Sequence, residues 1–167
     1  MAYVNKRPIP RERVVTTVDH INQTEVTFES VLNNTINESV VVQVGERLGL
    51  FTSEYDFGKY INDYMSRFPG FFDMGVGIYG KANYLDGLRV RWNYAKVKEY
   101  VIANVISIEP VTHEELVDFL DDSYEWNDLN EEERQSVNDI VLGYHIEESF
   151  SKWVALERQG FNIVILE

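Results

Sequence analysis

The stretch that decides the fold of the C-terminal third is residues 112–144, THEELVDFLDDSYEWNDLNEEERQSVNDIVLGY. It holds two capping-box motifs, Thr112 with Glu115 and Asn130 with Glu133. In such a box the first side chain accepts a hydrogen bond from the backbone three residues later, and the acid reaches back to the first residue. Each motif therefore predicts the start of a helix. Apolar residues follow both motifs at helical spacing, which supports two helices.

The apolar residues of the second predicted helix change sides near Gly143. One set is Val137, Ile140, Val141 and Tyr144. The other is Ile146, Phe150 and Trp153, with Glu157 on the same side, and the two sets lie about 180° apart at roughly 100° per residue. A straight surface helix cannot bury both sets against one wall. Either the helix is sandwiched between two layers, or the chain breaks at residues 143–145; we expect the break, with Val137 and Trp153 both buried.

Working outward, the remaining segments predict an α+β fold in a single domain spanning residues 1–167. Residues 1–10 contain two prolines and no periodicity, so they predict a loose N-terminal arm. Residues 11–108 predict a β-rich part, a mixed or antiparallel sheet with one central helix. Residues 109–160 predict an acidic helical part. Residues 161–166 are apolar on both faces, which predicts a buried, interior final strand.

Within the β-rich part, short alternating patterns predict the individual strands. These are a hairpin over 13–31, strands at 40–44, 48–51 and 88–94, and a partial strand within 97–108. The predicted central helix is 54–68, where Phe57, Ile61, Tyr64, Met65 and Phe68 form one apolar stripe before Pro69.

The charge of the chain is distributed unevenly. Residues 1–108 hold 12 basic and 12 acidic side chains, whereas residues 109–148 hold 14 acidic side chains and one base, Arg134. The whole net charge of −13 therefore resides in the C-terminal third. Such an asymmetry indicates an acidic surface, not a generally acidic protein.

The acidic residues of this third are the candidate binding residues. Glu114, Asp118 and Asp122 are spaced at i, i+4 and i+8, so one long helix would align them on one face, opposite Leu116, Phe119 and Leu120. We expect Glu114, Asp118, Asp121 and Asp122 to be exposed. The full candidate set is Glu114, Glu115, Asp118, Asp121, Asp122, Glu125, Asp128, Glu131, Glu132 and Asp139.

Several function classes find little support in the sequence. The chain has no cysteine, so thiolate catalysis and zinc–thiolate sites are excluded. Gly75–Gly80 fits G-x-G-x-x-G, but no strand-then-helix pattern surrounds it, so a glycine-rich loop or bulged strand is expected. His113-Glu-Glu and His145-Ile-Glu-Glu match no metal motif, and no nucleophile elbow occurs. We predict a non-enzymatic protein without metal or cofactor. With no apolar run long enough for a membrane span and no secretory signal, we predict a cytoplasmic location.

The segment 55–100 supports a different class, a nucleic-acid binder. It contains twelve aromatic residues interleaved with bases, and Arg89 and Arg91 share one face of the predicted strand. On a sheet, aromatic side chains can stack on the bases of single-stranded nucleic acid, and basic side chains can neutralise its phosphates. The overall negative charge opposes this, so direct nucleic-acid binding is not the first expectation.

The first expectation is therefore an acidic protein that docks on a cationic protein surface, such as the groove of a nucleic-acid-binding enzyme. Small antirestriction and anti-CRISPR proteins of phages and mobile elements act as DNA mimics in this manner, and the similarity lies in charge and size alone. A phage structural or assembly protein is the alternative, with the acidity serving solubility and docking. The nucleic-acid binder using Arg89 and Arg91 is the third hypothesis.

Overall fold

The structure, a computed structural model, describes residues 1–9, 14, 27–51, 54–120 and 124–166. Its described part is mostly helical and carries one small antiparallel sheet of three strands, so the class is broadly α+β with far more helix than expected. The chain forms two compact units. We call Met1–Glu99 with Leu156–Glu167 the sheet-containing unit, and Tyr100–Ala155 the acidic unit. That the whole chain is one domain stays a prediction.

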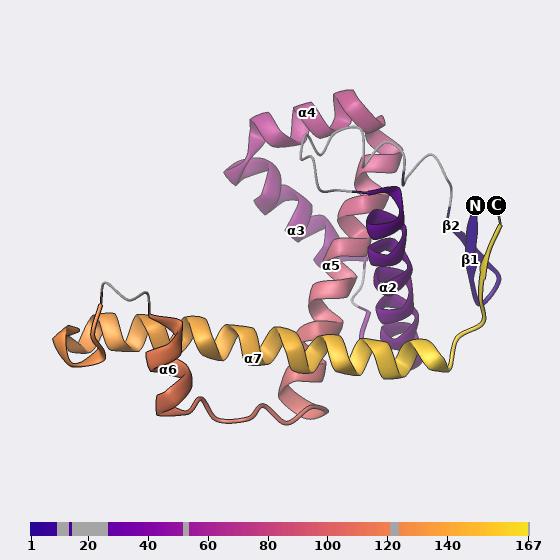
Figure 1. Cartoon of the computed structure of the whole chain (residues 1–167). Helices are drawn as coiled ribbons and strands as arrows, with labels where there is room; N and C mark the ends of the chain where they lie inside the picture. Colours follow the sequence, from indigo (N-terminus) through magenta and orange to yellow (C-terminus); the bar gives the residue numbers. More distant parts are fainter. Residues whose placement is uncertain (10–13, 15–26, 52–53, 121–123, 167) are drawn as a thin grey trace. The chain divides into compact units, whose positions relative to one another are not determined.

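Figure 1 labels the elements along the chain. The strands are β1 (Ala2–Val4), β2 (Arg7–Ile9) and β3 (Ile163–Ile165). The helices are α2 (Phe28–Arg47), α3 (Glu54–Arg67), α4 (Pro69–Tyr79), α5 (Lys81–Asn104), α6 (His113–Phe119), the short 3-10 helix η1 (Trp126–Asp128) and α7 (Glu131–Gln159). No helix in the described ranges combines the length and apolarity that a transmembrane segment requires.

The sheet joins the two ends of the sequence, with the strand order β2-β1-β3 (Figure 1). The expected loose arm is wrong: residues 2–9 form a hairpin whose turn, Asn5 and Lys6, has positive φ at both positions, as a type I′ hairpin turn requires. Ala2 and Val4 are fully buried.

The final strand exists but is not interior. β3 pairs only with β1 in the described sheet and lies at its edge. Val164 and Ile165 are 42% and 54% exposed, so the prediction of a buried strand is wrong. An apolar run of six residues does not by itself distinguish an interior strand from an edge strand.

The prediction of a β-rich part over residues 11–108 is also wrong. Residues 40–44 lie inside α2, and the strand expected at 88–94 lies inside α5, which extends to Asn104. Residues 48–51 form no strand, and the glycine-rich stretch 71–79 belongs to α4. Of the predicted hairpin, residues 28–31 begin α2, whereas residues 13 and 15–26 lie outside the described residues.

A capping box explains why α2 begins at Phe28 although the helix is rich in β-branched residues. The Thr27 hydroxyl accepts from the Ser30 N–H at 3.1 Å, and the Thr27 N–H donates to the Ser30 hydroxyl at 3.2 Å. Val40, Val41 and Val44 are buried, so packing outweighs the weak preference of valine for strands.

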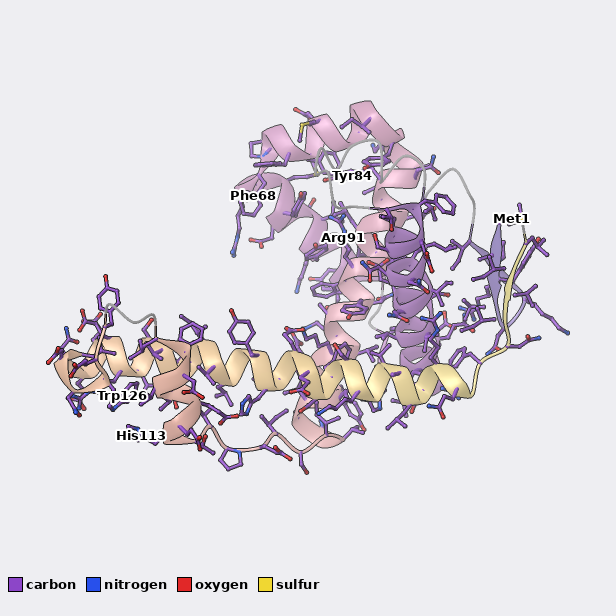
Figure 2. The ribbon with its side chains drawn as sticks, in the orientation of Figure 1. Met1, Phe68, Tyr84, Arg91, His113 and Trp126 are labelled. Carbon is purple, nitrogen blue, oxygen red and sulfur yellow. The ribbon has the colours of Figure 1, made fainter. Side chains whose placement is uncertain are left out.

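The predicted central helix is confirmed as α3, and it packs with α4 and α5 around an aromatic core. Phe57, Phe72 and Leu88 form the buried centre of this core. The Tyr64 and Tyr84 hydroxyls lie 3.1 Å apart, and burial is the main cause that raises the pKa of Tyr84 to about 12. Figure 2 shows Tyr84 beside α4.

In the acidic unit both capping boxes are confirmed. Glu115 N–H donates to the Thr112 hydroxyl at 3.3 Å, and Glu133 N–H donates to Asn130 Oδ1 at 3.0 Å. In both boxes the glutamate carboxylate accepts the first residue's N–H at 2.8 Å. These bonds satisfy backbone groups that the first turn of a helix leaves unpaired.

The expected break at residues 143–145 is wrong, because α7 is one unbroken helix. Gly143 has no positive φ, and one glycine within a helix costs only about 1 kcal/mol relative to alanine. Trp153 is buried and Val137 is half-buried, but Ile140 and Tyr144 are exposed. The helix therefore continues unbroken through the change of stripe and leaves part of the first stripe unburied.

Candidate functional site

The acidic residues predicted to bind a partner are largely at the surface. Glu115 is half-buried, and Asp121 and Asp122 lie outside the described residues. The others are exposed, and we call them the acidic surface: Glu114, Asp118, Glu125, Asp128, Glu131, Glu132 and Asp139.

The acidic surface is built from three elements, not from one long helix. α6 ends at Phe119, and Leu120 already has extended backbone angles. The expected row of Glu114, Asp118 and Asp122 on one helix is therefore wrong, because only the first two belong to α6. The ψ of Leu120, 138°, is not helical, so the helix ends before this residue.

The two basic side chains of the acidic unit are engaged within it. Arg134 donates to the carbonyl oxygens of Trp126 at 3.2 Å and Asn127 at 3.1 Å. Lys152 forms an ion pair of 2.8 Å with Glu148, one turn away on α7. Residues 100–155 contain 14 acidic side chains against these two bases. The surface of this unit is therefore strongly negative, and a cationic partner would meet little competition from within the unit.

A histidine clamp connects α7 to α6 and to the segment before it. The Nδ1 atom of His145 lies 3.0 Å from the Glu109 carbonyl oxygen, and Nε2 lies 3.0 Å from Oε1 of Glu115. The other oxygen of Glu115, Oε2, accepts from the Thr112 N–H and hydroxyl, each at 2.8 Å. The sequence assigned no specific role to His113 or His145, and in the structure His145 connects α7 to α6.

The geometry of the clamp favours a charged imidazole. Both ring nitrogens face oxygen acceptors, and only the doubly protonated ring can donate from both. The hydrogen bond to the Glu109 carbonyl, followed by the negative charge of Glu115, raises the pKa of His145, whereas burial opposes them. Hydrogen bonds from Thr112, with a further contribution from His145, lower the pKa of Glu115.

We predict a pH-dependent stability from this clamp. The raised pKa of His145 means that its contribution is complete below the ordinary value of 6.5 and is lost as pH rises through the folded-state value. The lowered pKa of Glu115 means that its contribution is complete above 4.5 and is lost as pH falls. The clamp is therefore strongest between these two values.

The measurement is chemical denaturation at about pH 6 and about pH 8, on either side of the histidine titration. His145→Gln should remove most of the loss of stability that the wild type shows between them, because glutamine does not titrate. His113→Gln is the matched control, since His113 contacts the Trp126 ring instead (Figure 2), and it should leave the loss unchanged. Identical pH dependence in wild type and His145→Gln would contradict the clamp.

Sites for small ligands are not apparent in the described parts of the chain. No group of three or more histidine, aspartate and glutamate residues there could hold a metal ion. Gly75 lies within α4 and Gly80 ends it, so the expected loop or bulged strand is wrong and this stretch is not a phosphate-binding turn before a helix. A shallow hollow on the surface is lined by residues of α7 alone, so it has no opposite wall. The lining residues are Glu131, Glu132, Gln135, Ser136, Asp139 and Ile140.

The alternative nucleic-acid face is not a strand. Arg89 and Arg91 lie on α5, where two positions are separated by roughly 200° around the helix, so they do not share a face. The Arg89 guanidinium pairs with both carboxylate oxygens of Glu54 and lies 4.2 Å from the ring centroid of Phe57. Arg91 is exposed. The structure thus separates the two bases that the sequence had placed together.

Sequence reasoning missed an apolar patch beside the acidic surface. Phe119 of α6 and Tyr144 of α7 have ring centroids 6.1 Å apart, and Ile140 lies one turn before Tyr144. Their exposed fractions are 40%, 60% and 44% for Phe119, Tyr144 and Ile140. We call these three residues the Phe119 patch. The helical spacing had predicted all three to be buried, and nothing in the spacing distinguishes a core stripe from an exposed one.

Comparison with protein-family models and with curated proteins found no match to this chain.

Proposed function

We propose that this protein is a non-enzymatic binding protein whose acidic surface docks on a cationic surface of another protein. The observation that supports it most is the combination of exposed acids with internally engaged bases. Seven carboxylates predicted from the sequence are exposed, six on α6, η1 and α7 and one, Glu125, immediately before η1. Arg134 and Lys152 are held by neighbouring groups.

We further propose that the partner is a nucleic-acid-handling protein, which the acidic surface inhibits or modulates by partly imitating DNA. A nucleic-acid groove is the most strongly cationic surface that proteins commonly present, and it is shaped to accept an array of negative charges. Opposite charges would accelerate association and make it sensitive to salt. An origin in a phage or mobile element, with a role against host defence, is part of the same proposal.

The test begins with capture of partners from a cell lysate on the immobilised protein at low salt, followed by identification by mass spectrometry. We expect a nucleic-acid-binding protein that is released by added duplex DNA. Retention of partners that duplex DNA cannot displace would contradict DNA mimicry.

The contribution of the acidic surface is then measured by binding kinetics at two salt concentrations. The triple variant Asp118→Asn, Asp128→Asn and Asp139→Asn should slow association about tenfold at low salt, because rim charges act mainly on the on-rate. The control Glu29→Gln, Asp73→Asn and Asp86→Asn removes the same charge from exposed positions of the sheet-containing unit and should have a much smaller effect. Equal association rates for the two triple variants would contradict the proposal that the acidic surface is the docking surface.

A second candidate is an assembly protein that packs against other protein subunits. The exposed face of α4 supports it: Phe71, Met74 and Ile78 are 61%, 54% and 38% exposed, at positions i, i+3 and i+7. Large exposed apolar patches are typical of interaction sites. Light scattering across a concentration series would distinguish the candidates, because an assembly protein should associate without a cationic partner.

A further inference from the structure

The Phe119 patch gives the acidic surface a feature that imitation of DNA does not need. The Phe119 and Tyr144 rings contact each other, and Ile140 continues the apolar strip along α7. A phosphate-binding groove is complementary to charge and offers little that would cover apolar side chains. Exposed apolar side chains in contact with one another, bordered by charge, indicate a protein-binding site.

Acidic side chains border the patch on both helices that form it. Asp118 precedes Phe119 on α6, and Asp139 precedes Ile140 on α7, and both are exposed. A second copy of the chain would bring the same negative charge against this border, and like charges in apposition oppose association. The charge of the border therefore selects a basic partner, and the patch selects one that also carries apolar side chains.

We infer that the Phe119 patch seats a basic amphipathic helix of the partner protein, and this inference rests on the proposed docking function. Such a helix presents an apolar stripe at i, i+4 and i+7 with bases on its flanks. The stripe covers Phe119, Ile140 and Tyr144, while the bases meet Asp118, Asp139 and the neighbouring acids. Because apolar contacts are not screened by salt, this part of the affinity persists at high ionic strength, whereas the charge-dependent part declines.

The test uses two synthetic peptides of identical composition as probes. One places leucines on a single helical face with lysines elsewhere, and the other has the same residues in a scrambled order. We expect the wild type to bind the amphipathic peptide about tenfold more tightly, since truncating a well-covered interface anchor typically changes affinity by about that factor. The preference should remain at high salt, while binding of both peptides weakens.

Variants of the protein show whether the Phe119 patch is responsible for the preference for the amphipathic peptide. Ile140→Ser with Tyr144→Ser should abolish the preference and still bind both peptides through charge. Leu156→Ser is the control, because Leu156 is also an exposed apolar residue of α7 (66%) but lies outside the acidic unit. It should behave as the wild type.

The outcomes separate this inference from the proposed function. If the wild type binds both peptides equally well, or if the double variant keeps the preference, the inference is overturned and the acidic docking surface stands. If the wild type binds neither peptide at low salt, the docking function itself fails. Circular dichroism of each variant confirms that α7 is retained.

Discussion

Phe150→Ala is expected to destabilise the protein by about 3 to 5 kcal/mol, the usual cost of removing a fully buried aromatic ring. Phe150 is 2% exposed and its ring lies 5.4 Å from that of Trp153, on the buried side of α7. The truncation leaves a cavity in the acidic unit that the surrounding side chains fill only in part. Urea denaturation followed by far-ultraviolet circular dichroism measures the loss.

Leu156→Ala is the matched control for this prediction. Leu156 lies on the same helix but is 66% exposed, so its truncation should change stability by about 0.5 kcal/mol or less. If the two variants had similar stabilities, Phe150 would not lie in a packed core.

Gly45→Ala is expected to destabilise the sheet-containing unit by about 2 kcal/mol or more through overpacking. A methyl group at Gly45 would lie 2.3 Å from Cγ2 of Val97 and 2.8 Å from the Phe51 ring. Val97 is fully buried and β-branched, so it has little room to move. The gain in helix propensity, about 1 kcal/mol, is too small to offset this clash.

Gly143→Ala, also a change of a glycine within a helix, is expected to have the opposite effect on stability. A methyl group there meets no atom within 4 Å, and the residue lies inside α7. Alanine should therefore stabilise the helix by up to about 1 kcal/mol. Thermal denaturation of both variants measures the contrast. A stabilised Gly45→Ala would show that α2 does not approach Val97 closely, and a destabilised Gly143→Ala would favour the break expected from the sequence.

The helix N-termini that could be predicted from the sequence are those that depend on interactions between residues close together in the chain. The boxes at Thr112 and Asn130 depend on residues three apart, so no distant contact is needed to form them. The amphipathic stripe of residues 54–68 extends over several turns and is likewise local. In the acidic unit, the exposure of Asp118 and Asp139 follows from the cost of burying unpaired charge.

The wrong strand predictions have one physical origin. Val40–Val44 and Leu88–Tyr94 are short windows in which β-branched or alternating residues fit a strand, but each lies within a helix of 20 or more residues. In α5 the buried residues Val97 and Val101 are four apart and share one helix face, whereas Leu88 lies about 180° around the helix from Val97 and packs with Phe57 and Phe72. Short apolar windows therefore cannot decide between helix and strand, and tertiary packing decides.

The candidate site was predictable in composition but not in shape. The acids of residues 109–148 are visible in the sequence, whereas the His145 contact with Glu115 joins positions 30 residues apart. The Phe119 patch was hidden because helical spacing identifies an apolar side without showing what covers it. Which apolar side remains exposed depends on the packing of α6 and α7, and that is a property of the folded chain.

The sheet that joins β1 to β3 has a consequence for the order in which the chain acquires its structure. The β1–β2 hairpin closes over two residues, but Asn5 meets Asn162 across 157 positions of sequence. Closing so long a loop costs more conformational entropy than forming any of the helices, whose contacts are local. On a ribosome, β1 would be synthesised long before β3 and could not pair with it until β3 had emerged. We therefore expect the helices to form before the three-stranded sheet, which can be completed only after β3 has been synthesised.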